Sequence, residues 1–144
     1  MKRMSALSLL VVGVVVSGCA SVERLVRPEE AEPGPVYPMS TERDRVRDIQ
    51  VFREETELIL TNTTAEDFES GGRLWVNAEY SMPIESLPIG ETRRLDLREF
   101  VNEYGERFRA GGFFATERPD GVVLVEMEHK GRLDGLVLVR GGRP

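Results

Sequence analysis

The chain has 144 residues, of which 40% are hydrophobic and 31% are charged, and its formal net charge at pH 7 is −6. The length suits one domain, and the composition is that of a globular protein. The excess of acidic residues disfavours nucleic acid and anionic lipid as partners, because both are bound through Lys and Arg contacts to phosphate.

Residues 1–18 are organised as a cleaved secretory signal peptide. Lys2 and Arg3 give a positive start, residues 7–16 are mostly apolar, and small residues precede Cys19. The apolar run is shorter than the roughly 18 to 20 residues that cross a bilayer, which favours a removed signal over a permanent transmembrane helix. Removal leaves 17 basic and 25 acidic residues, and hence a net charge of −8.

The stretch Val16-Ser17-Gly18-Cys19 resembles the bacterial lipobox, in which an aliphatic residue and two small residues precede a cysteine. The resemblance implies a bacterial lipoprotein, with a diacylglyceryl thioether on Cys19, cleavage before it, and acylation of the new amino group, as with palmitate. Two or three acyl chains hold a protein on a membrane far more firmly than one. An uncleaved apolar helix with an incidental cysteine is the alternative. Cys19 is the only cysteine, so no disulfide is expected.

The residue after the cysteine bears on the location of the anchored protein. Ala20 stands there, where an aspartate would indicate retention in the inner membrane. The lipobox resemblance therefore implies the outer membrane, facing the periplasm, in a Gram-negative cell. In a Gram-positive cell the same leader implies the outer face of the cytoplasmic membrane, and the sequence leaves the cell type open.

Residues 19–42 are predicted to be the lipidated cysteine and an extended tether. Four prolines lie between positions 28 and 38, and no hydrophobic period is sustained. Proline-rich segments are extended and semi-rigid. At about 3.1 Å per residue, some twenty residues reach on the order of 60 Å.

Residues 43–144 are predicted to form one β-domain. Alternating or continuous apolar segments predict strands over residues 46–52, 58–62, 73–80, 84–87, 91–97, 107–110, 122–127 and 136–139. Glu54-Glu55 suits a tight connection between the first two strands, and residues 63–72 read as a polar loop. The spacing over residues 98–104 predicts one or two helical turns ended by Gly105. Residues 128–135 predict the loop of a C-terminal hairpin.

Seven or eight short strands with one short helical turn predict an all-β fold, a small β-sandwich. The segment Leu87-Pro88-Ile89-Gly90-Glu91, followed by an alternating strand, resembles the connection found in immunoglobulin-like domains of bacterial envelope lipoproteins. It departs from that pattern by one residue inserted between proline and glycine. The resemblance implies an immunoglobulin-like architecture and says nothing of function.

The chain carries little that indicates catalysis. His129 is the only histidine, it lies at a predicted hairpin end, and no Gly-x-Ser-x-Gly elbow accompanies it. Glu126 and Glu128 lie two apart on one strand face, about 6.5 Å from each other, which is a spacing that a glycosidase can use. The inner face of that strand is expected to hold Val123, Val125 and Met127, so the two glutamates are expected on a solvated outer face.

The loop over residues 63–72 contains Glu66, Asp67 and Glu69. Calcium loops need six to eight oxygens in an ordered pattern, which this loop lacks. We therefore expect no metal and no cofactor, although the sequence leaves open whether this loop binds an ion.

Three aromatic residues are candidates for a partner surface. Trp75 lies on the strand face opposite Leu74, either in a second core layer or as an exposed anchor. Phe113 and Phe114 are adjacent, so one of them is expected to be exposed. Large aromatic side chains are enriched at interaction hot spots.

These features predict a membrane-anchored, non-enzymatic binding module of the cell envelope, whose partner is an unknown envelope protein or polymer. Two alternatives stay open. One is a hydrolase of envelope polysaccharide acting through the Glu126 and Glu128 pair, and the other is a purely structural lipoprotein.

Overall fold

The computed structural model describes residues 31–140, so the predicted signal peptide, Cys19 and the first part of the predicted tether lie outside the described residues. The strands are β1 (Arg43–Glu54), β2 (Glu57–Asn62), β3 (Gly72–Val76), β4 (Tyr80–Ile84), β5 (Thr92–Asp96), β6 (Val125–His129) and β7 (Arg132–Val139). A single 3-10 turn, η1 (Leu97–Glu99), follows β5. Within the described part of the chain, no helix is long and apolar enough to cross a membrane.

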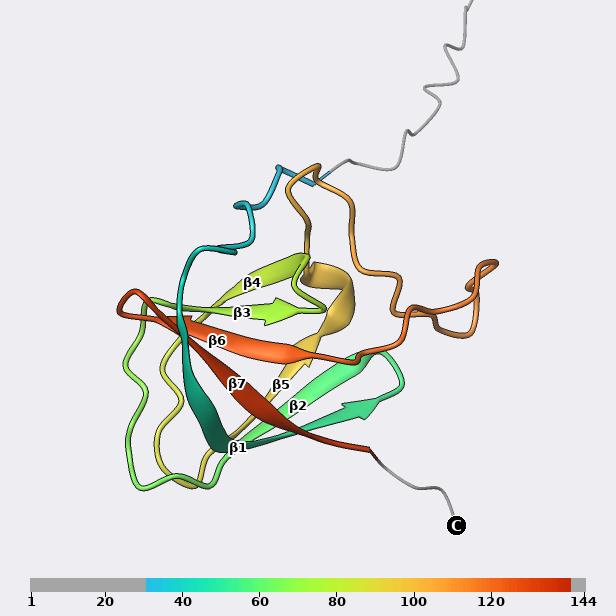
Figure 1. Ribbon diagram of the computed structural model, residues 1–144. Coiled ribbons are helices and arrows are strands. Elements are labelled where there is room, and N and C mark those ends of the chain that lie inside the picture. Colours follow the sequence, from blue (N-terminus) through green and yellow to red (C-terminus); the bar gives the residue numbers. More distant parts are fainter. Residues whose placement is uncertain (1–30, 141–144) are drawn as a thin grey trace, which may run out of the picture.

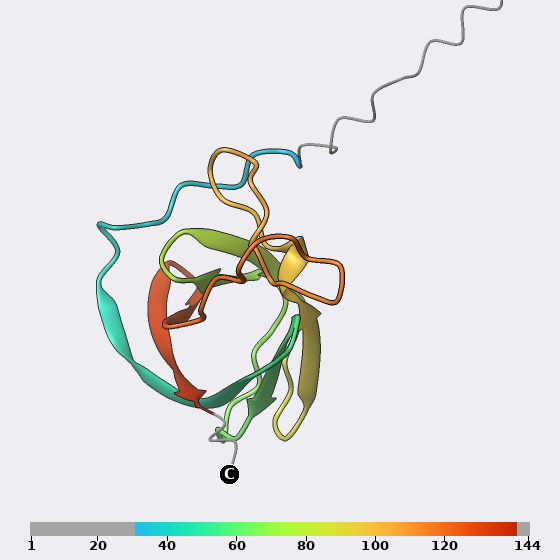
Figure 2. The same cartoon turned by 90° about the vertical axis from the view of Figure 1, so that its right-hand side faces the viewer.

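The seven strands form one mixed sheet in the order β4-β3-β6-β7-β1-β2-β5. β1 runs parallel to β7, and the other neighbouring pairs are antiparallel. The sheet curls around its own core, so that the chain traces a nearly closed ring (Figures 1 and 2). The all-β prediction is confirmed, but the immunoglobulin-like sandwich is not, because every described strand belongs to the same sheet.

The curl has a physical cause in β1, the longest strand. Its pairing with β7 shifts register twice, between Arg43 and Val46 and again between Arg47 and Gln50. Such irregularities bend a strand and increase its twist. Because β1 is long and bent in this way, the sheet curves along it. The two layers expected of a sandwich are therefore one continuous curved layer.

The core fills the concave side of the sheet. Alternate residues of β2 point inward, and Leu58 and Leu60 are completely buried. β6 contributes Val125 and Met127 in the same way. The other large core side chains include Ile49, Phe68, Leu74, Leu87, Leu97, Phe100 and Phe108.

The predicted continuous strand over residues 73–80 is wrong, because β3 and β4 are the arms of a hairpin. Asn77 and Ala78, at the turn, both have φ of 56°. The Asn77 side chain accepts hydrogen bonds from the backbone N–H groups of Val123 (2.9 Å) and Leu124 (3.3 Å), and donates one to the Gly121 carbonyl (2.8 Å). Partners more than forty residues away hold the turn, so local alternation did not reveal it.

The helical turns predicted over residues 98–104 reduce to η1. Asp96 caps this turn by accepting a hydrogen bond from the Arg98 backbone N–H (2.9 Å), and Phe100 is already extended. Val101 then forms a bridge with Ser81 of β4, with backbone hydrogen bonds of 2.8 and 3.1 Å. This bridge between distant residues competes with the helix that local spacing favours.

Two predicted hairpins are present. Glu55, with φ of 50°, turns β1 into β2, and Lys130 and Gly131 turn β6 into β7. The second connection is tighter than the predicted loop over residues 128–135, because β7 begins at Arg132 and contains Gly135 within it. β4, which contains Pro83, is an edge strand. The strand predicted over residues 84–87 is wrong, because β4 ends at Ile84 and Leu87 forms an isolated bridge with Phe68.

Residues 31–42 follow the outside of the curled sheet before entering β1 (blue in Figure 2). The Gly34 N–H donates to the Asn102 carbonyl at 2.8 Å, and a Cβ on Gly34 would lie only 3.0 Å from the Val101 carbonyl oxygen. The described half of the predicted tether therefore lies against the domain.

Candidate binding surfaces

Trp75 projects from the outer face of β3, as the alternation of that strand indicated, but its side chain is only 1% exposed. The Tyr37 ring covers it edge to face, with ring centroids 5.2 Å apart. Its indole N–H donates to the Glu128 carboxylate at 2.9 Å. Trp75 is thus part of a second buried layer outside the sheet and offers no surface to a partner while Tyr37 covers it.

Glu126 lies beside this layer and is also 1% exposed. It accepts hydrogen bonds from the Tyr37 hydroxyl (2.6 Å) and from Nε of Arg43 (2.6 Å), and Arg43 also donates to the Tyr37 hydroxyl (2.9 Å). Burial, together with the neighbouring Glu126 carboxylate, raises the pKa of Tyr37. We call Tyr37, Arg43, Trp75 and Glu126 the outer-face cluster.

The expectation that both glutamates of the acid pair are solvated is therefore wrong for Glu126. The pair does lie on the outer face of β6, but the N-terminal segment covers that face. Glu126 binds Tyr37 and Arg43, and Glu128 binds the Trp75 indole. Each carboxylate is engaged with partners from the protein itself.

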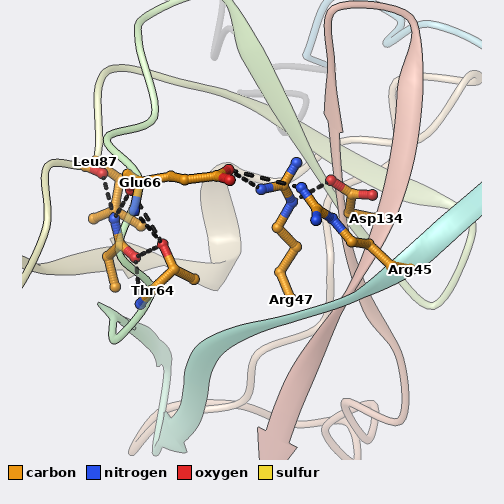
Figure 3. Close-up of polar contacts among 7 residues, drawn as sticks. Arg45, Arg47, Thr64, Glu66, Leu87 and Asp134 are labelled. Carbon is orange, nitrogen blue, oxygen red and sulfur yellow. Dashed lines mark hydrogen bonds and ion pairs between the residues drawn. The ribbon is translucent and has the colours of Figure 1, made fainter.

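The carboxylates of the loop between β2 and β3 point to separate partners. Arg47 of β1 lies between Glu66 and the buried Asp134 of β7, with both contacts at 2.5 Å (Figure 3). The bond from Arg47 holds the pKa of Glu66 below its usual value. Asp67 accepts from the Ile89 N–H at 2.8 Å.

No three His, Cys, Asp or Glu side chains gather as metal ligands anywhere in residues 31–140.

The loop between β2 and β3 is fixed to the domain by Asn62, which is fully buried. Its amide nitrogen donates to the carbonyls of Glu66 and Leu87, both at 2.9 Å, and its amide oxygen accepts from Thr64 (Figure 3). These bonds give the cluster in Figure 3 a structural role.

Phe113 and Phe114 are 96% and 90% exposed, and their rings pack edge to face with centroids 5.0 Å apart. They lie in the long connection between η1 and β6, which projects from the sheet (orange in Figure 1). Both rings face solvent, where the sequence predicted exposure of one. This pair is the most exposed aromatic surface among the described residues.

The base of this connection is clamped although its tip is exposed. Arg109 forms an ion pair with Asp120 at 2.8 Å, and the Asp120 N–H donates to the Arg109 carbonyl at 2.8 Å. Arg53 of β1 donates to the Ala110 carbonyl at 2.8 Å. Gly111 has φ of 86°, and a Cβ there would lie 2.9 Å from Pro119, so the return of the chain requires glycine.

A pocket of about 700 Å³ lies where the two edges of the curled sheet approach each other. We call it the seam pocket. β4 and β5, the edge strands, supply opposite walls, and the turn between β6 and β7 closes one end. The lining includes the apolar Met82, Ile84 and Leu95, the basic Arg73, Arg93 and Lys130, the acidic Glu85 and Glu128, and His129.

Sequence reasoning missed the seam pocket. Its walls come from strands that are not neighbours in the sheet, and only the curl brings them together. One local signal was present: Arg93 lies two residues before Leu95 and so shares its inward face of β5, which is an unusual place for a charged side chain. No family model, curated protein or solved structure matches this chain.

Proposed function

We propose that this protein is a lipid-anchored, non-enzymatic binding module of the bacterial cell envelope, and that the Phe113–Phe114 tip contacts an envelope protein. The observation that carries the proposal is the exposure of two stacked aromatic rings on a loop with a clamped base. Contiguous exposed apolar groups mark interaction sites, and aromatic residues, phenylalanine included, are enriched at protein interfaces.

The clamped base supports this role because it prepares the rings for binding. A partner that binds a flexible loop must first order it, and that ordering reduces affinity. Here the bonds from Arg53 and within the Arg109–Asp120 pair hold the loop before any partner arrives. A protein partner fits better than an anionic lipid surface, because the chain is acidic overall.

The anchor rests on the lipobox resemblance at Cys19. Residues 31–42 lie against the domain, so only residues 19–30 remain between the lipid and the described structure. Twelve residues span at most about 40 Å when fully extended. The proposed module would therefore reach partners close to the membrane, below the height of about 60 Å expected for a free tether.

The hydrolase alternative has no support from the geometry of its two residues. Glu126 is buried under Tyr37 and Arg43, and Glu128 holds the Trp75 indole. The two carboxylates therefore cannot face one sugar together while Glu126 stays buried.

Photo-crosslinking in cells tests the proposal. A photoreactive phenylalanine analogue is placed at position 113, and in a control protein at position 104, where Tyr104 is 75% exposed. We expect one discrete crosslinked protein from position 113 and its loss in the Phe114→Ser variant. Identical crosslinks from both positions, or no discrete product from position 113, would contradict the proposal and favour a structural lipoprotein.

The anchor is tested separately by mass spectrometry of the native N-terminus. The expected product begins at Cys19 and carries diacylglyceryl and acyl groups. Membrane fractionation then assigns the protein to the inner or outer membrane. Recovery of an intact leader with a free Cys19 thiol would contradict the anchor.

A further inference from the structure

We propose that the seam pocket is a second binding site, which takes a small amphipathic anion: a phosphate or carboxylate carried on a short hydrocarbon body. The site is separate from the Phe113–Phe114 tip, so it stands whether or not that tip binds a protein. Three features of the pocket favour such a ligand: the open seam, the apolar wall and the placement of Arg93.

The seam stays open because backbone pairing stops short of closing it. β4 and β5 are the edges of the sheet in the described chain. Val101 covers β4 only at Ser81, which leaves the stretch from Met82 to Ile84 facing the gap. The resulting volume of about 700 Å³ falls within the range of roughly 300–1,000 Å³ typical of small-molecule sites.

The hydrocarbon body of the ligand would lie on the apolar wall. Met82 and Leu95 are half-buried, and both pack against the core. Ile84, on the same inward face of β4, is 7% exposed. This wall continues the core outward into the pocket, so an apolar group bound there would extend core packing.

Arg93 supplies the anion contact. It lies on the inward face of β5, and its Nε is buried without a hydrogen-bond partner in residues 31–140. Its Nη2 lies 3.3 Å from Glu91, and the side chain as a whole is 37% exposed. A guanidinium presents its N–H groups as a fork that matches carboxylate and phosphate, so an anion in the pocket would meet the exposed end of this side chain. Nε is itself buried, so it would join the contact only through a turn of the side chain that opens it to the pocket.

The remaining charges around the pocket favour an anion. Arg73 donates to Ser81 at 3.1 Å, and Lys130 pairs with Glu69 at 3.1 Å at the exposed rim. Against these cations, Glu128 is held by the Trp75 indole, and Glu85 is exposed to solvent. The lining thus carries three basic side chains and two acidic ones, with the inward basic group beside the apolar wall.

An extended peptide added as a strand across the seam is less favoured. The free stretch of β4 contains Pro83, which has no backbone N–H to donate to a new strand. A small ligand needs no such ladder. Peptide addition is nevertheless an outcome that the experiment below can detect.

In the test, hexyl phosphate is titrated into the mature full-chain protein in nanodiscs, and empty nanodiscs serve as the blank. Isothermal titration calorimetry measures the heat of binding, and NMR follows the signals of isotope-labelled Met82. We expect saturable one-site binding with shifted Met82 signals. Hexanol, inorganic phosphate and hexyltrimethylammonium, which each lack one element of the ligand, are expected to bind at least about tenfold more weakly.

A matched pair of variants assigns the anion contact. Arg93→Gln should weaken hexyl phosphate binding at least about tenfold. Arg94→Gln, at the next position, should leave binding unchanged, because Arg94 points outward and pairs with Glu54 and Glu57. Thermal melting checks that both variants fold, and wild-type binding with the three control ligands tests the proposal without any variant.

Several results would overturn the proposal. Equal binding of hexanol would show an apolar site without anion recognition, and equal binding of inorganic phosphate would show a simple anion site. The proposal would also be contradicted if hexyl phosphate binding did not saturate, or if Arg93→Gln left the affinity unchanged. Binding only of an extended peptide, with β4 amides newly protected from hydrogen exchange, would contradict it as well.

Discussion

The outer-face cluster and the Phe113–Phe114 tip present similar side chains in opposite environments. Trp75 and the two phenylalanines all point away from the core of the curled sheet. Trp75 is 1% exposed because Tyr37 lies over it, whereas Phe113 is 96% exposed. An outward-facing strand residue is therefore available to a partner only if no other segment crosses it. A residue at a projecting loop tip is exposed by its position.

Truncating the two aromatic residues gives the largest expected contrast. Trp75→Ala should lower the free energy of unfolding by about 3–5 kcal/mol, because it removes a buried indole and leaves Tyr37 and Glu128 without their partner. Phe113→Ala should change it by less than about 0.5 kcal/mol. Urea unfolding followed by far-UV circular dichroism measures both, and similar values for the two variants would contradict the comparison.

Removing the buried charge of the outer-face cluster should have the next largest effect. Glu126→Gln replaces a carboxylate that accepts from both Tyr37 and Arg43, and we expect a loss of about 1–3 kcal/mol in unfolding free energy. Glu69→Gln is the matched control, since Glu69 is 74% exposed and pairs with the exposed Lys130. Its effect should stay within about 0.5 kcal/mol in the same urea experiment. Equal losses would mean that burial does not distinguish these carboxylates.

Alkaline pH should weaken the cover over Trp75. The pKa of Tyr37 is raised by burial and by Glu126, so the folded protein favours the protonated phenol. The stability from this preference is fully present below the ordinary value of 10.0 and is lost as pH rises through the higher folded pKa. Trp75 is the only tryptophan, so its emission should shift to the red above pH 10.

The Tyr37→Phe variant sharpens this test. It keeps the ring over Trp75 but removes the hydroxyl, so the stability change should be about 1 kcal/mol at neutral pH. The red shift above pH 10 should be much reduced. A shift of unchanged size in Tyr37→Phe would assign the alkaline transition to another group.

The smallest expected effect concerns the cap of η1. Arg98 holds the pKa of Asp96 below its usual value, so this contribution is present above the unfolded pKa and is lost as pH falls through the lower folded pKa. Arg98 is exposed, so Arg98→Gln should lower the free energy of unfolding at pH 7 by less than any of the changes above. The difference from wild type should narrow below pH 4, in urea unfolding across that range.

The sequence predicted those parts of the fold that depend on neighbouring residues. The tight connection at Glu55, the strand that contains Leu58 and Leu60, and a C-terminal hairpin with its turn inside residues 128–135 all follow from local signals. The turn at Asn77 was missed because its partners lie more than forty residues away. Local pattern says where a strand can form, but distant contacts decide where this one ends.

The candidate sites also differ in whether they depend on neighbouring residues or on distant ones. Phe113 and Phe114 were identified from two adjacent aromatic residues after glycines, and their exposure follows from a loop tip. The burial of Glu126 could not be predicted, because it depends on how residues 31–42 cross the sheet. The seam pocket depends on the curl of the sheet and hence on the register shifts of β1. The residue pattern of β1 does not predict those shifts.

Hydroxyl-radical footprinting of the protein in intact cells and of the purified protein in nanodiscs distinguishes a loop tip covered by a partner from a free one. We expect Phe113 and Phe114 to react readily in nanodiscs and to be protected in cells, where the proposed envelope partner is present. Trp75 should be protected in both states. Reaction of Trp75 in nanodiscs, or equal reaction of the phenylalanines in the two states, would contradict the account.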